Sequence, residues 1–257
     1  MGLLAEIRQQ QILQELRRAG QLKVCRLAEE LSVTEVTIRR DLRKMQHSGL
    51  LKKTYGGAVP SDLPEMNASV HYRQTRSLIA KKTIGSLASE LVKDNDIIFL
   101  EAGSTCYEII PHLASRKNLT IIVNSLYLMR RLAAMGKHKI ILTGGQYRQQ
   151  RMEMVGPTAE AAISQLGGFK AFTGADDISI SAGISGADVV TVSFAKLVLK
   201  KASEVIFVGD NTKFDNPALY KIADLSELDY IVTNTRPSKK WISAAKTNRI
   251  QLVYPKE

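Results

Sequence analysis

The first 59 residues show apolar side chains at helical spacing in three successive stretches, 5–19, 22–31 and 35–47. Such spacing places the apolar side chains on one side of each helix, where they can pack into a common core. In the third stretch the expected buried stripe consists of Ile38, Leu42 and Met45. Because only a few residues separate the second and third stretches, the pattern favours two helices joined by a tight turn.

Thr34 is the expected N-cap of the third helix, because its hydroxyl can accept a backbone N–H of the first helical turn. The side opposite the apolar stripe is basic and β-branched. This combination suits the major groove of DNA, where arginine can bind guanine and the methyl groups of valine and threonine can contact thymine. The residues expected to contact DNA from this helix are Thr34, Val36, Thr37, Arg39, Arg40, Arg43 and Lys44.

Residues 50–59 are expected to form a β-hairpin around Gly56 and Gly57. Lys52, Lys53 and Tyr55 lie on it, in the place of a wing that contacts DNA phosphates. Residues 1–59 are therefore predicted to form a winged helix-turn-helix domain. They contain 11 lysine and arginine residues against 6 acidic ones. A protein–protein adaptor with solvated arginines is the alternative, but the position of the excess charge favours DNA.

Residues 60–76 contain prolines among polar residues and are predicted to be a linker. From residue 77 to 257, short apolar runs alternate with helical stretches. This alternation predicts a doubly wound, mostly parallel α/β sheet domain with helices on both faces. The expected strands are 97–100, 120–123, 139–142, 171–173, 205–208, 230–232 and 250–253. The expected helices are 79–92, 105–113, 126–134, 158–165, 192–202 and 239–245.

Small polar residues and glycines follow several of the expected strands. In doubly wound sheets, ligands bind outside the carboxyl ends of the strands. A glycine, a serine and a threonine that enter a helix suit a phosphate group, and a lysine supplies the counter-charge, although each motif alone is also typical of a plain turn or helix cap. The expected effector-binding residues are Gly103, Ser104, Thr105, Asn124, Ser125, Gly144, Gly145, Asp176 and Lys213.

Composition and motifs narrow the function further. The net charge of +11 over 257 residues favours a polyanionic partner. The sequence shows no secretory signal and no apolar run near the roughly 18 residues of a membrane span, so we expect a cytoplasmic protein without membrane contact. Cys25 and Cys106 are too few for a disulfide framework or zinc site and are expected as packed thiols. Neither HExxH nor GxxxxGK[ST] occurs, and no cofactor or metal is expected.

Taken together, these motifs resemble the DeoR-type bacterial transcriptional regulators over nearly the whole chain. The matching segments are 37–42 (TIRRDL), 54–57 (TYGG), 102–105 (AGST), 124–125 (NS), 144–145 (GG) and 210–214 (DNTKF). The resemblance implies a regulator, usually a repressor of sugar catabolism genes. It also implies a C-terminal domain similar to sugar-phosphate isomerases that binds a phosphorylated sugar as inducer, and a homodimer or homotetramer that binds a double-stranded DNA operator.

Two segments depart from the family pattern. The family typically has Gly-Ala-Asp-Gly at the positions of residues 174–177, where this chain has Asp177 in place of the last glycine. It typically has Asp-Ser-Ser-Lys at the positions of residues 210–213, where this chain has Asn211 and Thr212 in place of the two serines. We expect Asp177 to be strained if the backbone there has positive φ, and its carboxylate to repel a nearby phosphate.

Two other functions are compatible with the same residues. One is a sugar-phosphate isomerase with a DNA-binding appendage, for which Glu101, Asp176, Asp177 and Asp210 are candidate general bases. The other is a DNA-binding adaptor without a small-molecule effector. Binding is favoured over catalysis because the second strand ends in Asn124 and Ser125, neither of which is an efficient base.

Overall fold

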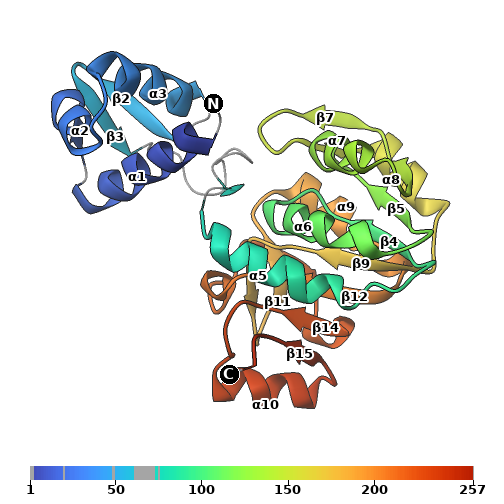
Figure 1. Ribbon diagram of the computed structural model, residues 1–257. Coiled ribbons are helices and arrows are strands. Elements are labelled where there is room, and N and C mark those ends of the chain that lie inside the picture. Colours follow the sequence, from blue (N-terminus) through green and yellow to red (C-terminus); the bar gives the residue numbers. More distant parts are fainter. Residues whose placement is uncertain (1–2, 20, 48–49, 61–72, 75, 257) are drawn as a thin grey trace. The chain divides into compact units, whose positions relative to one another are not determined.

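The computed structural model describes residues 3–19, 21–47, 50–60, 73–74 and 76–256 (Figure 1). The chain forms two compact units, Met1–Arg76 and Ser77–Glu257. Most of the predicted linker, residues 61–72 and 75, lies outside the described residues. None of the described helices is long and apolar enough to cross a membrane.

Within its described residues up to 60, the first unit contains α1, α2 and α3 and a small antiparallel sheet with the strand order β1-β3-β2. Its elements are α1 (Leu3–Ala19), β1 (Leu22–Lys23), α2 (Val24–Glu30), α3 (Glu35–His47), β2 (Leu51–Thr54) and β3 (Gly57–Pro60). The predicted stripe of α3 is buried completely: Ile38, Leu42 and Met45 have no exposed surface, and they pack with residues of α1 and α2 in one core. The predicted winged helix-turn-helix fold is confirmed.

Three local expectations in this unit are wrong. The second helix begins at Val24 and not at residue 22, because Leu22 and Lys23 pair with Ala58 and Gly57 of β3. Gly57 therefore belongs to a strand, where a Cβ atom would lie 1.9 Å from the Leu22 carbonyl oxygen. The turn of the hairpin consists of Tyr55 and Gly56, the two residues before Gly57. Cys25, expected as a packed thiol, is exposed, whereas Cys106 is buried.

The second unit is built on a seven-stranded parallel sheet with the order β15-β14-β12-β9-β4-β5-β6. Its strands are β4 (Ile97–Leu100), β5 (Thr120–Val123), β6 (Lys139–Leu142), β9 (Phe169–Thr173), β12 (Ala202–Val208), β14 (Tyr230–Val232) and β15 (Gln251–Val253). Its helices are α5 (Leu78–Ser89), α6 (Ser104–Ile109), α7 (Leu126–Met135), α8 (Pro157–Ser164), α9 (Val189–Lys201) and α10 (Lys239–Thr247). All seven predicted strands are present, and the predicted doubly wound fold is confirmed.

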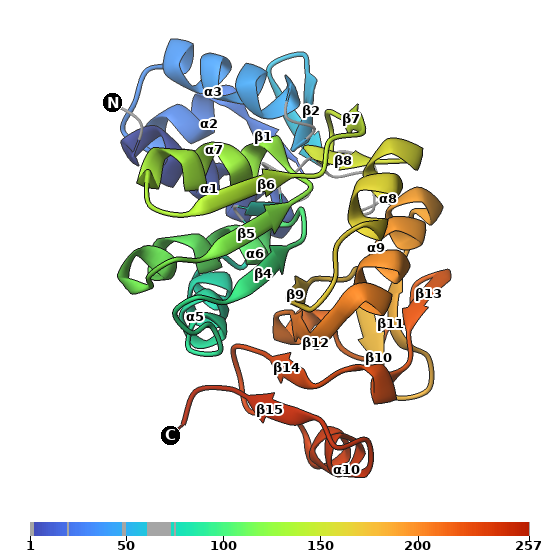
Figure 2. The ribbon, with the colours of Figure 1, turned by 90° about the vertical axis from the view of Figure 1, so that its right-hand side faces the viewer.

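Side-chain alternation along the strands builds a separate core on each face of the sheet. In β4, Phe99 packs toward the face covered by α8, α9 and α10, whereas Ile98 and Leu100 pack toward the face covered by α5, α6 and α7. Figure 2 shows α5 and α6 on one side of the strands and α8 and α9 on the other. Because helices cover both faces of the sheet, a ligand site is expected at the edge formed by the carboxyl ends of the strands.

The structure also contains strands that the apolar pattern did not indicate. They form a hairpin, β7 (Gln146–Arg148) and β8 (Glu153–Val155), and a second sheet of β10 (Asp177–Ser179), β11 (Gly183–Gly186) and β13 (Tyr220–Ala223). Asp177 opens β10 and is not among the residues with positive φ, so the expected backbone strain is absent. The helix predicted over 105–113 is α6 followed by a 3₁₀ helix, Ile110–Ser115, in which Pro111 lacks the N–H that an α-helix needs.

Candidate nucleic-acid interface and effector site

The N-terminus of α3 is capped as the sequence predicts. The Thr34 hydroxyl accepts the Thr37 backbone N–H at 3.3 Å. Val36 follows it with 75% of its surface exposed, an unusual position for a large apolar side chain unless a partner covers it. The exposed first turn of α3 therefore presents methyl groups beside its capped end.

The rest of the outer face of α3 is basic. Arg40, Arg43 and Lys44 are exposed, and no hydrogen bond or ion pair of their side chains is recorded among the described residues. Arg39 lies on the flank and binds Glu35 one turn earlier, with 2.9 Å between Nη2 and Oε2. All the residues expected on this helix thus lie on its exposed side or at its N-terminus.

Asp41 is the one acidic residue on the buried side of α3, and the sequence reasoning missed its role. Its side chain is 1% exposed and accepts hydrogen bonds from Arg8 Nε at 2.6 Å and Gln9 Nε2 at 3.3 Å, both from α1. Arg8 is itself mostly buried by this contact, with 16% of its side chain exposed. The ion pair fixes α3 to α1 from behind the exposed basic face of α3.

The wing is joined to the same helix. The Lys53 backbone N–H donates to Gln46 Oε1 of α3 at 2.9 Å, which ties β2 to the end of α3. Lys52 is exposed, and Tyr55 is fully exposed at the hairpin tip beside Gly56, whose φ is +87°. The three predicted wing residues therefore lie on one hairpin beside α3.

In the second unit, the strand order determines which predicted site residues become neighbours. From β4 the chain continues outward to β5 and β6, then returns to the other side of β4 and continues through β9 and β12. The direction reverses between β4 and β9, and such a switch point is where open parallel sheets bind ligands. Gly103, Ser104 and Thr105 follow β4, Asp176 follows β9, and Lys213 follows β12.

These three segments lie on adjacent strand ends. Since neighbouring strands are about 4.8 Å apart, the ends of β4 and β12 are separated by roughly 10 Å across β9. Gly103 is extended and precedes α6, whose first-turn N–H groups have no intrahelical partner. Lys213 is half-buried in a 3₁₀ helix, Asn211–Lys213. Lys213 and a helix start thus lie at the same edge of the sheet.

Glu101 is buried at this switch point. Its Oε2 atom accepts hydrogen bonds from the Thr173 hydroxyl and from the Gly174 N–H, the latter at 3.1 Å. The pKa of Glu101 is raised to about 7, mainly because burial disfavours the charged carboxylate. The hydrogen bond from Thr173 lowers this pKa, whereas the nearby Glu153 carboxylate raises it further. The Glu101 carboxylate therefore ties the end of β4 to the end of β9.

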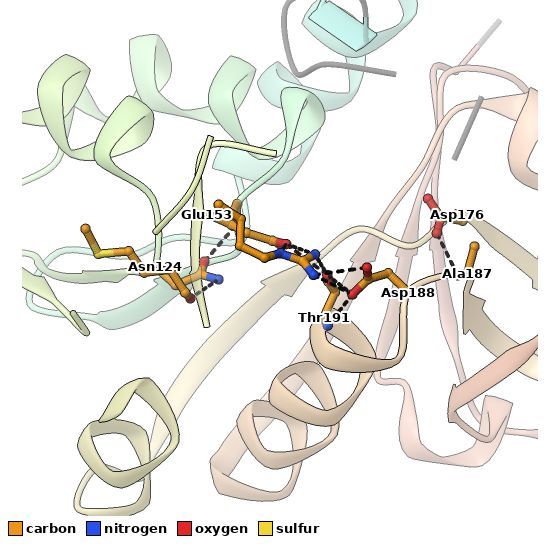
Figure 3. Close-up of polar contacts among 9 residues, drawn as sticks. Asn124, Glu153, Asp176, Ala187, Asp188 and Thr191 are labelled. Atoms are coloured by element: carbon orange, nitrogen blue, oxygen red, sulfur yellow. Dashed lines mark hydrogen bonds and ion pairs between the residues drawn. The ribbon is translucent and has the colours of Figure 1, made fainter. Parts of the chain in front are cut away.

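Asn124 and Ser125 have a different environment from the one expected of ligand-binding residues. Both are 1% exposed. Asn124 accepts the Ala102 N–H at 2.8 Å and donates to the Met154 carbonyl at 3.3 Å, and the Ser125 hydroxyl donates to the Met152 carbonyl at 2.6 Å. Figure 3 shows Asn124 within these contacts. Their side chains connect the end of β5 to the loop after β4 and to the segment leading into β8.

The hairpin is also bound to the start of α9 by a charged network that the sequence reasoning missed (Figure 3). Arg148 of β7 donates to Glu153, to Asp188 at 2.9 Å and to the Thr191 hydroxyl at 2.8 Å. Glu153 is 2% exposed, and Asp188 is the N-cap of α9. Burial alone raises the pKa of Asp188, but hydrogen bonds from the Thr191 N–H and Arg148 outweigh it and lower that pKa.

The remaining predicted site residues have clear local roles. Asp176 accepts the Ala187 N–H at 2.9 Å, which joins the end of β9 to the end of β11. Gly144 and Gly145 have φ of +69° and +110°, and a Cβ atom on Gly145 would lie 2.7 Å from the Val155 carbonyl oxygen. The turn from β6 into β7 therefore requires glycine.

Asp210 and Asn211 order the segment that contains Lys213. Asp210 is 3% exposed and accepts the Thr212 N–H at 2.9 Å. Asn211, one of the departures from the family pattern, receives a hydrogen bond at 3.2 Å from the Asn234 side chain and donates its N–H to that residue at 2.9 Å. Among the described residues, no group of three or more histidine, cysteine or acidic side chains is arranged to hold a metal ion.

The first unit thus has the fold of a DNA-binding domain, and the second has the polar strand ends outside which open parallel sheets bind ligands. Residues 8–62 match the model of the DeoR-like helix-turn-helix domain, and residues 77–235 match that of the DeoR C-terminal sensor domain. The chain belongs to the DeoR family of transcriptional regulators.

Two relatives illustrate the range of the family. The transcriptional repressor AccR of Agrobacterium fabrum is 32% identical over 89% of each chain. The L-fucose operon activator of Haemophilus influenzae is 28% identical over 88% of this chain and 91% of its own. Among solved structures, ribose 5-phosphate isomerase A from Neisseria gonorrhoeae aligns over 53% of each chain with a TM-score of 0.40 and 17% identity.

Proposed function

We propose that the protein represses a carbohydrate catabolism operon and is released from its operator by a phosphorylated sugar. The supporting observation is the meeting of the start of α6, Asp176 and Lys213 at the switch point of a sensor-domain sheet. Backbone N–H groups at a helix start and a lysine bind phosphate, and a carboxylate can accept sugar hydroxyls. Family relatives include both a repressor and an activator of named operons, and we favour repression. We also propose a cytoplasmic location, because the operator of a bacterial regulator lies in the cytoplasm.

Thermal-shift screening of the full-length chain tests this proposal. Phosphorylated sugars should raise the unfolding temperature, whereas the same sugars without phosphate should not. A ligand at 100 times its Kd stabilises the folded state by about 2.7 kcal/mol. The ligand with the largest shift should then weaken operator binding. A screen in which no sugar phosphate shifts the transition would favour an adaptor without an effector.

An isomerase activity is the second possibility, and the environment of the candidate bases argues against it. Glu101 accepts two hydrogen bonds, Asp176 accepts one from Ala187, and Asp210 caps a 3₁₀ helix. Asp177 lies in β10. A general base must be within reach of a substrate proton, and these carboxylates already order the strand ends. A coupled optical assay across pentose and hexose phosphates should detect no turnover.

Arg40 and Lys52 should contribute to DNA binding in different ways. Arg40→Ala should cost about 1 to 3 kcal/mol on the operator and relax base preference, because an exposed arginine of α3 can contact base edges. Lys52→Ala should weaken binding to every DNA sequence, because Lys52 contacts phosphate. It should also lower the salt slope, which is the steepness with which the logarithm of the binding constant falls with the logarithm of the salt concentration, by about one. Arg26→Ala, at an exposed arginine of α2, is the matched control. Equal losses on operator and random DNA would remove Arg40 from the base-contacting residues.

We further propose that the protein acts as a homodimer or homotetramer, because one winged helix-turn-helix recognises only a short site. Exposed apolar residues at the start of α9 and beside β13 suit such an assembly: Val189 is 55% exposed and Leu219 is 78% exposed. Footprinting should show paired half-sites with centres about 34 Å apart or at multiples of that distance. A sedimenting monomer that still binds its operator at nanomolar concentration would contradict this.

A further inference from the structure

The excess positive charge of the chain is concentrated at its two ends. Residues 1–59 have a net charge of +5, and residues 234–257, less than a tenth of the chain, also have a net charge of +5. The 174 residues between them contribute only +1. The first concentration is explained by the DNA-binding domain. The second concentration of charge lies in the unit Ser77–Glu257, called the sensor unit below. Most of it lies beyond residue 235, where the match to the sensor-domain model ends.

The basic side chains of this C-terminal segment are all exposed, three of them in α10 and the others in the turns before and after α10 and after β15. They are Arg236, Lys239, Lys240, Lys246, Arg249 and Lys256. Trp241 and Ala245 form the buried side of α10, with 2% exposure each. At about 100° per residue, Lys239 and Lys246 lie within about 20° of each other and about 100° to 160° away from this buried pair. The outward face of α10 is therefore a cationic stripe.

The charges are placed against the local preference of the helix. Lys239 and Lys240 occupy the first turn of α10, which contains no acidic residue. The positive end of the helix dipole disfavours cations there. Lys240 is compensated by Asp215, 2.8 Å away. Within the described residues it is the only one of the six with a recorded ion pair. Such uncompensated placement is expected where charge serves a function and not the stability of the fold.

We propose that this C-terminal basic surface, made by Lys239, Lys246, Arg249 and their basic neighbours, contacts the phosphate backbone of duplex DNA beside the operator. The proposal rests on the function of the chain as a DNA-binding regulator. Duplex DNA presents a negative charge about every 1.7 Å along its axis, and lysine binds phosphate as a point charge without demanding a fixed geometry. The surface adds affinity for DNA of any sequence, while α3 selects the operator.

The test compares full-length wild type with the triple variant Lys239→Gln, Lys246→Gln and Arg249→Gln. The DNA is a duplex selected by the wild-type chain from a random library, in its minimal form and extended by about 30 base pairs on each side. On the extended duplex the variant should show a salt slope lower by about 3, since each lost phosphate contact contributes about 0.9. On the minimal duplex the two proteins should have the same slope.

The matched control is Lys93→Gln, Lys117→Gln and Arg130→Gln, which removes three exposed positive charges elsewhere in the unit. It should behave as wild type. Fluorescence of Trp241, the single tryptophan of the chain, checks that α10 stays packed. Equal slopes for both triple variants on the extended duplex would overturn the proposal. Binding to phosphatidylserine vesicles is measured as well. If the slopes on DNA are equal and only the variant at Lys239, Lys246 and Arg249 loses vesicle binding, the surface binds membranes and not DNA. Failure of wild type to select any duplex would instead contradict the regulator function itself.

Discussion

Lys213→Ala should leave operator binding unchanged and abolish the response to the sugar phosphate. Lys213 follows β12, in the sensor unit, whereas the residues predicted to contact DNA lie on α3 and the wing. A hydrogen bond to a charged group contributes about 1.5 to 3 kcal/mol, so effector affinity should fall about 10- to 150-fold. Because coupling is reciprocal, an effector that lowers operator affinity tenfold must bind the DNA-free protein tenfold more tightly. Without that binding, the variant should not respond to the effector.

The measurement is operator affinity with and without the ligand that gives the largest thermal shift. Ser104→Ala, at the start of α6, should reduce the response in the same way, because its segment would hold the other side of the phosphate. Lys200→Ala, at an exposed lysine near the end of α9, is the matched control and should respond as wild type. An undiminished response in Lys213→Ala would show that the phosphate binds elsewhere.

Arg148→Ala should lower the free energy of unfolding of the sensor unit by about 3 kcal/mol, because it leaves the Glu153 carboxylate buried without its cation. Glu153 is 2% exposed and would keep only the Thr191 hydroxyl, 2.9 Å away. The hairpin of β7 and β8 would also lose its connection to the N-cap of α9. The effect should exceed that of removing an exposed arginine, which is usually within about 0.5 kcal/mol.

Denaturant unfolding followed by tryptophan fluorescence measures this loss. Trp241 is the single tryptophan and lies in α10, so the signal reports the sensor unit and not the winged helix-turn-helix. Arg130→Ala, on the exposed side of α7, is the control. The double variant Arg148→Met with Glu153→Gln should recover much of the stability, since it removes both charges together. A double variant as unstable as Arg148→Ala would show that the charge of Glu153 is not the cause.

The parallel sheet was predictable because its strands are buried on both faces and are therefore continuous apolar runs, such as 97–100 (IIFL) and 120–123 (TIIV). The strands of the hairpin and of the second sheet were not predictable in this way. Segments such as 146–148 (QYR) and 183–186 (GISG) are short and lack an apolar run or a clear alternation. Their pairing depends on contacts that only the folded chain supplies.

The same limit applies to the candidate site. The rule for the carboxyl ends of parallel strands places Ser104, Asp176 and Lys213 at one edge of the sheet. It does not separate residues that can meet a ligand from those that build the edge. Asn124 and Ser125 follow a strand as a ligand-binding pair would, yet their side chains bind backbone carbonyls. The network of Arg148 and Asp188 joins residues 40 positions apart, for which no sequence spacing gives a signal.

The ion pair between Arg8 and Asp41 has a consequence for the thermodynamics of operator binding. It holds α3, the predicted recognition helix, against α1 through side chains of the chain itself, and the hydrogen bond from Lys53 to Gln46 holds the wing in the same way. A surface ordered in advance loses little conformational entropy on association, so more of its contact energy appears as affinity. We therefore expect DNA binding to proceed without folding of the recognition helix, and with a heat-capacity change that reflects the buried contact surface alone.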